Sequence, residues 1–377
     1  MIVIYLDYSA TTFPNSKVLK TFNKACKKYH GNPNSSHYLG VKAKKEISDA
    51  TLNIANILGI KDYEIIYTSG ASEANNLAIK GLCKANKGKH IITTKMEHSS
   101  VVAPINRLCS DGYEVSFVNL KSSGLIDVDH LKSIIRDDTV LVSIVGVDSE
   151  LGIKQNIKAI LEVLKEYPNC YFHVDATQMV GKTTLELDGV DLVSFSAHKF
   201  FGIKGIGCLL KKKNVKLIPL IDGGASTTKY RSGTPTLELI LSLEKALSLA
   251  YKDFYVKEKY INKLNNDLKK FLASYSNIKI NSTKNSVSQI INFSCDNADK
   301  FVQLLNKNKV YLSTKSACSS ADSLSKSVNA IYNDEYRAKN SVRISLSYVT
   351  SKREIKKFMK IFDECYRRVN KDENIKV

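Results

Sequence analysis

Two ionisable side chains of this sequence follow apolar runs that are typical of buried strands. Asp175 ends the run YFHVD, and Lys199 follows the run DLVSFSA with only His198 between them. Aspartate and lysine are among the residues that are least often fully buried without a partner. A carboxylate and an amine at the ends of buried strands therefore have either a chemical or a structural purpose.

The chemical purpose would be to serve a pyridinium cofactor. Such a cofactor forms a Schiff base with a lysine amine and needs an acid at its ring nitrogen, which keeps the ring protonated and electron-withdrawing. The structural purpose would be an ion pair between Asp175 and Lys199. Judged on this pair alone, the two explanations are about equally good.

A small-residue turn, SGAS at 69–72, offers a site for a phosphate. It lies between the strand-like run YEIIYT and a helical pattern. The free N–H groups and the positive dipole end of a helix N-terminus favour an anion there. In isolation, however, the pattern favours a structural N-cap at Ser72.

The elements that would position these residues alternate between strands and helices. Near-continuous apolar strands separated by helical patterns predict an α/β fold, with a mostly parallel seven-stranded sheet covered by helices on both faces. Ligands of such sheets bind beyond the carboxyl ends of the strands. The predicted strands are 63–68, 90–95, 114–120, 139–147, 171–177, 191–197 and 207–211.

A chain of 377 residues suits a large domain plus a smaller one. The apolar pattern over about 236–272 predicts one long amphipathic helix that connects them. Beyond it, strands at 277–281, 288–294 and 341–347 mix with helices at 297–308 and 351–370. We expect a large domain at 13–250 and a small α+β domain formed by 1–12 and 251–377.

Eight motifs, in this order, resemble those of the cysteine desulfurases, which belong to the class V aminotransferase family of pyridoxal-phosphate enzymes. They are LDYSATT (6–12), GNPNSSH (31–37), TSGASEANNLAIKG (68–81), EHSSV (97–101), HVDATQMVGK (173–182), SFSAHKFFGIKGIG (194–207), RSGT (231–234) and SACSS (316–320). The resemblance is in register from residue 5 to about residue 360. It implies the fold type I architecture, and the placing of SACSS resembles the branch that supplies sulfur for iron–sulfur clusters and tRNA thiolation.

The resemblance also implies roles in binding pyridoxal 5'-phosphate. Lys199 would carry the cofactor, Asp175 would pair with its ring nitrogen, and Gln178 would hydrogen-bond its phenolic oxygen. Thr234 would reach the phosphate of the partner subunit, which implies a homodimer. The full set of implied cofactor-binding residues is Ala71, Ser72, Ser149, Asp175, Gln178, Ser196, His198, Lys199 and Thr234.

The implied reaction takes sulfur from L-cysteine and releases L-alanine. Lys199 would move the α-proton, His98 would stack on the ring and shuttle protons, and Arg343 would clamp the substrate carboxylate, which suits its planar fork. The Cys318 thiolate would attack the substrate sulfur and leave a persulfide on the protein, because a thiol is a poor nucleophile. The sulfur would pass to an iron–sulfur scaffold or a tRNA-thiolating enzyme.

The sequence context of Cys318 differs from that of the other cysteines. It lies among serines and alanine in a polar stretch that suits an exposed loop. The other seven lie within or beside apolar patterns, so we expect packing residues there. None forms a CxxC pair, so neither a zinc ribbon nor a thioredoxin motif is present, and no metal site is expected. Of the remaining histidines, His173 is expected to be structural, and His90 to be a surface or cap residue.

Three positions depart from the family pattern. Asp148-Ser149-Glu150 stands where the family reads Asn-Asn-Glu, and Gly223-Gly224-Ala225-Ser226-Thr227 stands where a third glycine, a His or Gln and a Glu are usual. Lys315 replaces the glycine before SACSS. These departures affect the expectations for rate, substrate preference and partner choice rather than for cofactor binding.

Other function classes remain open on the sequence alone. A related cysteine or cystine C–S lyase or a selenocysteine lyase would share the cofactor site without needing Cys318, and a degenerate scaffold homologue would release no alanine. The net charge of +19 could serve a nucleic-acid surface, but the excess is mostly lysine spread along the chain, which favours a solvated surface. No apolar run approaches the ~20 residues of a membrane span, so we expect a cytoplasmic protein.

Overall fold

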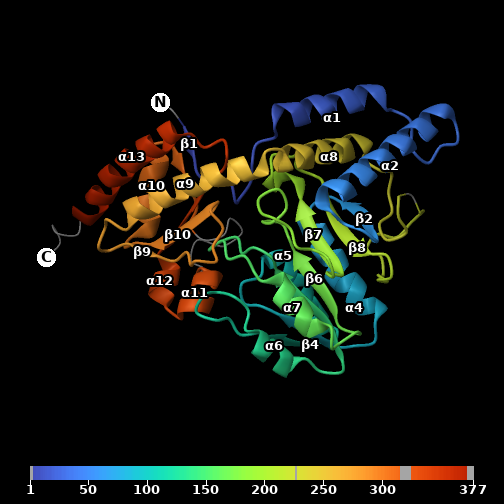
Figure 1. Cartoon of the computed structure of the whole chain (residues 1–377), viewed down its shortest axis with the longest axis horizontal. Coiled ribbons are helices and arrows are strands. Elements are labelled where there is room, and N and C mark those ends of the chain that lie inside the picture. The colour runs from blue at the N-terminus through green and yellow to red at the C-terminus, as the bar shows by residue number, and fades with distance from the viewer. Residues whose placement is uncertain (1–2, 226, 315–323, 372–377) are drawn as a thin grey trace.

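The structure is a computed structural model that describes residues 3–225, 227–314 and 324–371 (Figure 1). Its centre is a seven-stranded sheet in the order β2-β8-β7-β6-β5-β3-β4. All neighbours run parallel except β8, which is antiparallel to both β2 and β7. The strands are β2 (Tyr63–Thr68), β3 (His90–Thr93), β4 (Glu114–Phe117), β5 (Thr139–Val145), β6 (Tyr171–Asp175), β7 (Leu192–Ser196) and β8 (Gly207–Lys212).

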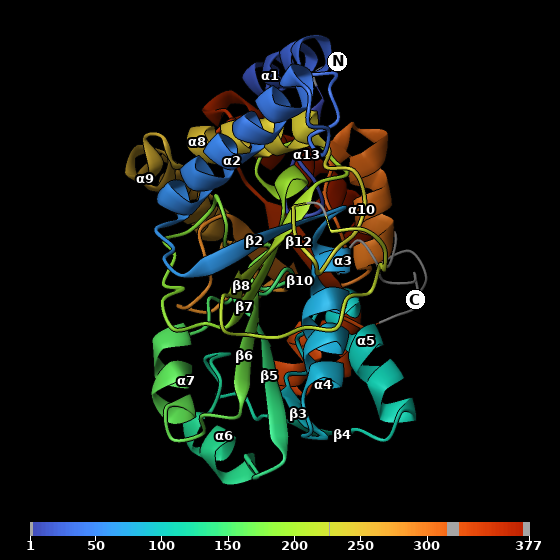
Figure 2. The same ribbon diagram turned by 90° about the vertical axis from the view of Figure 1, so that its right-hand side faces the viewer.

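The strands alternate their side chains between two helical layers, as the pleat of a sheet requires. On β7, Val193 and Phe195 belong to the hydrophobic cluster on one face of the sheet, whereas Leu192 belongs to the cluster on the opposite face. The helices over the first face are α1 (Ser16–Lys28), α2 (Tyr38–Leu58), α6 (Val128–Ile134), α7 (Ile157–Leu164) and α8 (Leu237–Tyr251). That opposite cluster includes α3 (Ala71–Asn76), the π-helical turn Leu77–Gly81, α4 (Leu82–Ala85) and α5 (Ser99–Ser110). Figure 2 shows the sheet between α7 and these last helices.

A third hydrophobic cluster is built from the N-terminal strand and the C-terminal third of the chain. Ile4 and Leu6 lie in it beside α9 (Phe254–Leu272), α10 (Ala298–Lys307) and α13 (Lys352–Lys371). Its strands form a sheet β12-β10-β9 and a parallel pair β1-β11. Their bounds are β1 (Ile4–Tyr5), β9 (Lys279–Ile280), β10 (Ile290–Ser294), β11 (Val310–Tyr311) and β12 (Ser341–Ser345).

Two short helices, α11 (Lys326–Tyr332) and α12 (Glu335–Lys339), pack against the residues that follow strands of the seven-stranded sheet. Val328 and Ala338 pack against Met96, Val145 and neighbouring residues at the ends of β3 and β5 in one further buried cluster. The proposed division into domains 13–250 and 1–12 plus 251–377 stays a prediction. None of the helices in the described part of the chain is long and apolar enough to cross a membrane.

The predicted seven-stranded, mostly parallel sheet is confirmed, with strand ends that differ by a few residues. The prediction of one helix over 236–272 was wrong. The chain leaves the helix at Lys252 and adopts a left-handed conformation at Asp253 (φ 53°), so α8 and α9 are separate helices that follow each other across the molecule in Figure 1. Both helices have apolar sides, and the apolar pattern continues across the break without marking it.

Gly207 is a position where the close approach of two backbones excludes a side chain. A Cβ there would lie 2.6 Å from the carbonyl oxygen of Phe195 and 2.7 Å from the backbone of Gly70. We therefore expect Gly207→Ala to lower the free energy of unfolding by about 1–3 kcal/mol through overpacking. The matched control is Gly224→Ala, whose Cβ would meet nothing within 4 Å. Equal urea unfolding midpoints for the two variants would contradict this prediction.

Candidate active site

One cavity of about 430 Å³ lies beyond the carboxyl ends of β5, β6 and β7. The turn before α3 and the segment after β1 complete its wall through Gly70 and Ser9. Of the residues predicted for the site, it brings together Ala71, Ser72, His98, Ser149, Asp175, Gln178, Ser196, His198, Lys199 and Arg343. Residues from five separate motifs therefore meet where an α/β sheet presents its ligands.

Asp175 and Lys199 reach the cavity because their strands are neighbours. β6 and β7 are parallel, and Asp175 is paired in register with Ser194, so the turn Ala197–Lys199 begins just beyond the end of β6. Lys199 Nζ donates to the carbonyl oxygens of Ser9 at 2.7 Å and Ala10 at 2.9 Å. The amine is thereby held by the N-terminal segment.

The carboxylate of Asp175 has its own donors. It accepts from Asn75 Nδ2 at 2.9 Å and from the Thr177 N–H at 3.0 Å, and its residue is 3% exposed. Within the described parts of the chain, Asp175 forms no ion pair with Lys199 or with any other cation. The structural explanation of the pair as a salt bridge was therefore wrong, and both groups remain directed to the cavity wall.

Gln178 lies three residues beyond β6 and has both ends of its amide engaged. Its Nε2 donates to the Ser9 carbonyl oxygen at 2.9 Å, and its Oε1 accepts from Lys182 Nζ at 2.6 Å. Burial lowers the pKa of Lys182 well below its ordinary value, and the positive charges of Lys199 and Arg343 lower it further. Ser9 thus accepts hydrogen bonds from Gln178 and Lys199 on one carbonyl oxygen.

His98 is linked to Asp175 through two side chains. Asn75 Nδ2 donates to both Asp175 and Ser100 Oγ, and Ser100 Oγ lies 2.8 Å from His98 Nδ1. His98 caps α5, because its Nδ1 also accepts from the Ser100 N–H at 3.1 Å. An accepting Nδ1 assigns the ring proton of the neutral imidazole to Nε2. Burial lowers the pKa of His98, which favours this neutral form.

The N-cap expected at Ser72 was wrong, and the phosphate site predicted at the start of α3 stays a prediction. The N-cap is Gly70, whose position makes no side-chain cap hydrogen bond, and Ser72 is the second residue of the helix. Ser196 and His198 face the same cavity from β7 and the turn that follows it. His198 Nδ1 lies 3.0 Å from Thr11 Oγ1, and burial together with nearby lysines lowers the pKa of His198 to about 4.

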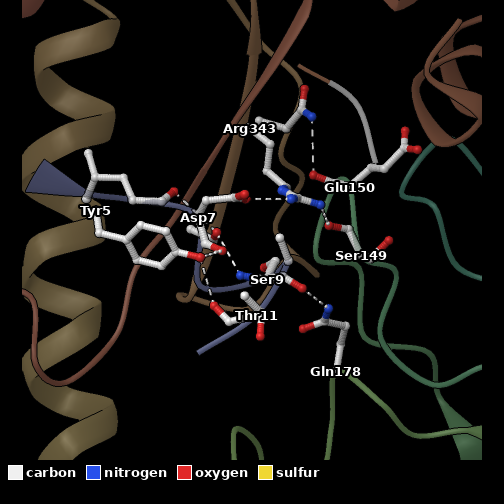
Figure 3. Close-up of polar contacts among 12 residues, drawn as sticks. Tyr5, Asp7, Ser9, Thr11, Ser149, Glu150, Gln178 and Arg343 are labelled. Atoms are coloured by element: carbon white, nitrogen blue, oxygen red, sulfur yellow. Dashed lines mark hydrogen bonds and ion pairs between the residues drawn. The ribbon is translucent and has the colours of Figure 1, made fainter. Parts of the chain in front are cut away.

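Arg343 comes from β12 and is held on two sides (Figure 3). Its Nη2 pairs with Asp7 Oδ1 at 2.7 Å, and its Nη1 donates to the Ser149 carbonyl oxygen at 2.9 Å. The side chain is 1% exposed, and its buried Nε has no hydrogen-bond partner among the described residues. Asp7 therefore orients the guanidinium without using all of its donors.

The departure at 148–150 lies between the site and α11. Asp148 accepts from Ser327 Oγ at 2.6 Å, and the Glu150 carboxyl accepts from Ser325 Oγ. Burial raises the pKa of both carboxyls, and for Glu150, whose pKa is raised to about 7, the neighbouring Asp148 adds to the effect. These contacts attach the start of α11 to the end of β5.

Two predicted residues are not placed in the cavity. Thr234 is exposed and lines a separate hollow with Arg231 and Thr68. Cys318 lies outside the described residues, as do Ser226 and Lys315 among the departures. The expected role of Cys318 therefore stays a prediction.

The predictions of where the other cysteines and two of the histidines lie are confirmed only in part. Five of the seven remaining cysteines are buried, but Cys26 and Cys109 are exposed on their helices. His173 is buried between Ser143 Oγ and Ser194 Oγ, as expected of a structural residue. His90 is also fully buried, between Thr139 Oγ1 and Ser116 Oγ, so the expectation of a surface residue was wrong.

Sequence reasoning missed several residues that hold this site together. Asp7, Asn75 and Lys182 all lie inside motifs that were recognised, but no role was assigned to them. The available signal was a charged or amide residue in an otherwise small or apolar motif. Ser9 and Ala10 act through their backbone carbonyls, for which side-chain identity carries no signal.

Comparison with known proteins identifies the family. The profile of Aminotransferase class-V matches residues 4–358. The chain belongs to the class-V aminotransferase family. It is 38% identical to "Cysteine desulfurase IscS" of Dictyoglomus turgidum over 365 residues, which cover 93% of this chain and 91% of that protein.

Solved structures agree with this assignment. A "NIFS-LIKE PROTEIN" superposes with a TM-score of 0.91 at 30% identity and covers 97% of this chain and 100% of its own. "SspA in complex with cysteine" superposes with a TM-score of 0.81 at 32% identity and covers 92% of this chain and 100% of its own. The resemblance seen in the eight motifs, and the fold type I architecture it implied, are confirmed.

The burial of His173 leads to a pH-dependent stability. Burial lowers the pKa of His173 below its ordinary value of 6.5, so in mildly acidic solution the unfolded chain binds a proton that the folded chain does not. Stability is then lost as the pH falls below 6.5. We expect His173→Gln to reduce the fall in unfolding free energy between pH 6.5 and about pH 4.5 by about 1 kcal/mol or more.

The measurement is urea unfolding at both pH values, with His30→Gln at an exposed histidine as the control. The comparison uses the difference between the two pH values within each protein, so an overall loss of stability in a variant does not affect it. The same fall for wild type and His173→Gln would show that His173 is not the group that titrates.

Proposed function

We propose that this protein is a pyridoxal-phosphate-dependent cysteine desulfurase, which converts L-cysteine to L-alanine and carries the sulfur as a persulfide on Cys318. The observation that supports it most directly is the placing of Lys199 and Asp175 on one cavity, from neighbouring strand ends and without an ion pair between them in the described structure. Asp175 is held by Asn75 and the Thr177 N–H, and Lys199 Nζ donates to the backbone of Ser9 and Ala10, so an amine and a carboxylate reach the same cavity on separate supports.

The residues present fit the cofactor. Asp175 is a buried carboxylate without a cation among the described residues, which suits the protonated nitrogen of a pyridinium ring. The hydroxyl of Thr177 is buried in the same wall and has no partner within the described ranges. The α3 N-terminus at Gly70 lacks a side-chain cap and faces the cavity, which suits the phosphate.

When bound, pyridoxal phosphate supplies an electron-withdrawing ring that makes the α-proton of an amino acid acidic. In the proposed site Asp175 holds a proton at the ring nitrogen, and Gln178 donates to the phenolic oxygen. Lys199 holds the cofactor through its Nζ and moves the proton at the substrate α-carbon. Ala71, Ser72, Ser196 and His198 would bind the phosphate, and Ser149 would take the place of the usual asparagine towards the phenolic oxygen.

Two further residues handle the substrate. His98 presents Nε2–H to the cavity in the tautomer assigned above, which suits proton transfer at the ring face. Arg343 keeps its Nε unpaired among the described residues while Asp7 fixes its plane, so a substrate carboxylate can accept from the fork.

The sulfur step balances without an outside redox reagent. The Cys318 thiolate attacks the sulfur of L-cysteine, the carbon–sulfur bond breaks, and a sulfur–sulfur bond forms. The carbon fragment keeps the electron pair of the broken bond and is protonated to give L-alanine. The persulfide sulfur then passes to an acceptor, either an iron–sulfur scaffold or a tRNA-thiolating enzyme.

The remaining proposals concern the oligomeric state and the cellular location. We propose a homodimer in which Thr234 approaches the phosphate bound by the other subunit, and its exposure in the single chain is compatible with that role. The cytoplasmic location expected from the sequence stays a prediction.

The first experiment tests the cofactor and the reaction together. Purified protein loaded with pyridoxal phosphate is expected to turn yellow, to be tagged by borohydride at Lys199 in a peptide map, and to release L-alanine from L-cysteine. Lys199→Ala should lose the tag and at least about 10³-fold of the alanine release, because the group that carries the cofactor and moves the proton is gone. A colourless wild-type protein without a tagged lysine would exclude the proposal.

The second experiment separates desulfurase from lyase. Cys318→Ala is expected to keep the yellow colour and lose at least about 100-fold in alanine release, because the attacking thiolate is absent. Cys109→Ala removes an exposed cysteine and serves as the control. Unchanged turnover in Cys318→Ala, with release of free sulfide, would instead support a C–S lyase or selenocysteine lyase.

A further inference from the structure

Lys182 is a partly buried lysine for which the proposed reaction has no use. It lies four residues after Gln178 in the turn that follows β6, and it does not line the main cavity. It lines a smaller cavity behind that wall, together with Lys199 and Gln289. Burying an amine is costly unless it is paired. Among the described residues Lys182 Nζ contacts no carboxylate, and its hydrogen bond is to Gln178 Oε1 at 2.6 Å.

The local backbone holds Lys182 in this place. The Lys182 N–H bonds to the Met179 carbonyl oxygen at 3.0 Å, and the preceding Gly181 has φ 75°. A Cβ on Gly181 would lie 2.7 Å from Phe200 Cβ, so only glycine lets this turn pack against the residue after Lys199. The Lys182 carbonyl oxygen accepts from Gln289 Nε2 at 2.7 Å, which fixes the end of the turn. The position of the amine is therefore built into the fold.

The amide of Gln178 has a donor end, Nε2, and an acceptor end, Oε1. Its two neighbours, the Ser9 carbonyl oxygen and the Lys182 amine, are compatible with only one orientation of the amide. The Ser9 carbonyl oxygen can only accept, so it must face Nε2, and the Lys182 amine donates an N–H to the Oε1 that this arrangement turns towards it. One N–H of Nε2 is used by Ser9. The other N–H has no hydrogen-bond partner among the described residues, and because Gln178 lines the cavity, it is the donor that this amide can offer to a ligand there.

We propose that Lys182 is a positioning residue, which fixes the amide of Gln178 so that an N–H group, and not the carbonyl oxygen, faces the bound ligand. This inference rests on the proposed function for its consequence, namely a donor aimed at the phenolic oxygen of pyridoxal phosphate. Without Lys182, Oε1 would be buried without a donor, and the amide would rotate to find one. A rotated amide would present an acceptor to an oxygen that itself only accepts.

The experiment measures cofactor affinity in the cofactor-free chain by equilibrium dialysis. Lys182→Met removes the donor at similar length, and Lys182→Arg keeps donors and charge. We expect Lys182→Met to weaken pyridoxal phosphate binding about tenfold, the effect of one hydrogen bond to a charged group, and Lys182→Arg to stay within about twofold. Lys154→Met is the control, since Lys154 bonds to Thr184 and does not line the cavity.

Two comparisons separate positioning from general damage. In a Gln178→Ala background, Lys182→Met should change affinity by less than about twofold, because the amide through which it acts is absent. A cofactor analogue that lacks the phenolic oxygen should bind wild type and Lys182→Met equally. An equal loss in the Gln178→Ala background, or with the analogue, would overturn the proposal.

A last measurement keeps this inference distinct from the proposed function. In the cofactor-free protein, the drop in unfolding midpoint caused by Lys182→Met should disappear or reverse in the Gln178→Ala background. If wild type bound no pyridoxal phosphate, the proposed function would fail. The comparison of unfolding midpoints, which is a double-mutant cycle, would still decide whether Lys182 acts on Gln178. Independent, additive midpoint shifts would overturn the inference in either case.

Discussion

The parallel pairing of β6 with β7 is the constraint on which the site depends. Asp175 stands in register with Ser194, so the carboxylate at the end of one strand and the turn that carries Lys199 leave the sheet at the same edge. A slip of one residue would turn every side chain of β6 to the opposite face. Val174 and Phe172 on that strand are buried in one cluster, so the hydrophobic effect holds the register that the chemistry needs.

The polar groups at this edge are satisfied by residues that belong to other motifs. Asn75 joins Asp175 to Ser100, and Ser100 reaches His98, so a carboxylate and an imidazole share one network. The backbone of the segment after β1 accepts from Lys199 and Gln178. Burial makes an unmade hydrogen bond costly in such a place, so the paired groups are held rigidly, while Asn75 Oδ1 and the Thr177 hydroxyl have no partner among the described residues. Rigidity of this kind keeps donors aimed at a ligand before it binds.

The side of the cavity at Arg343 is assembled from the two ends of the chain. Arg343 on β12 pairs with Asp7 beside β1 and also donates to the backbone oxygen of Ser149 after β5. Asp148 and Glu150 attach the start of α11 to the same place. The contact that Ser149 makes with Arg343 uses its backbone oxygen and not its side chain, so this contact does not require a particular side chain at position 149.

Much of this protein follows from the sequence alone. The apolar runs determined the seven strands, and ordered motifs determined the family and eight of the residues that line the cavity, because local burial and short spacing leave a readable pattern. Ser149 and Arg343 lie outside these motifs and were predicted from the family resemblance. The break at Asp253 left no such pattern, since the apolar side continues through it. Only the tertiary structure decided that Asp7 holds Arg343, that Asn75 serves Asp175, and that Lys182 holds Gln178. Asp7 and Arg343 lie 336 residues apart, and a contact of that kind depends on the path of the whole chain and not on local propensity.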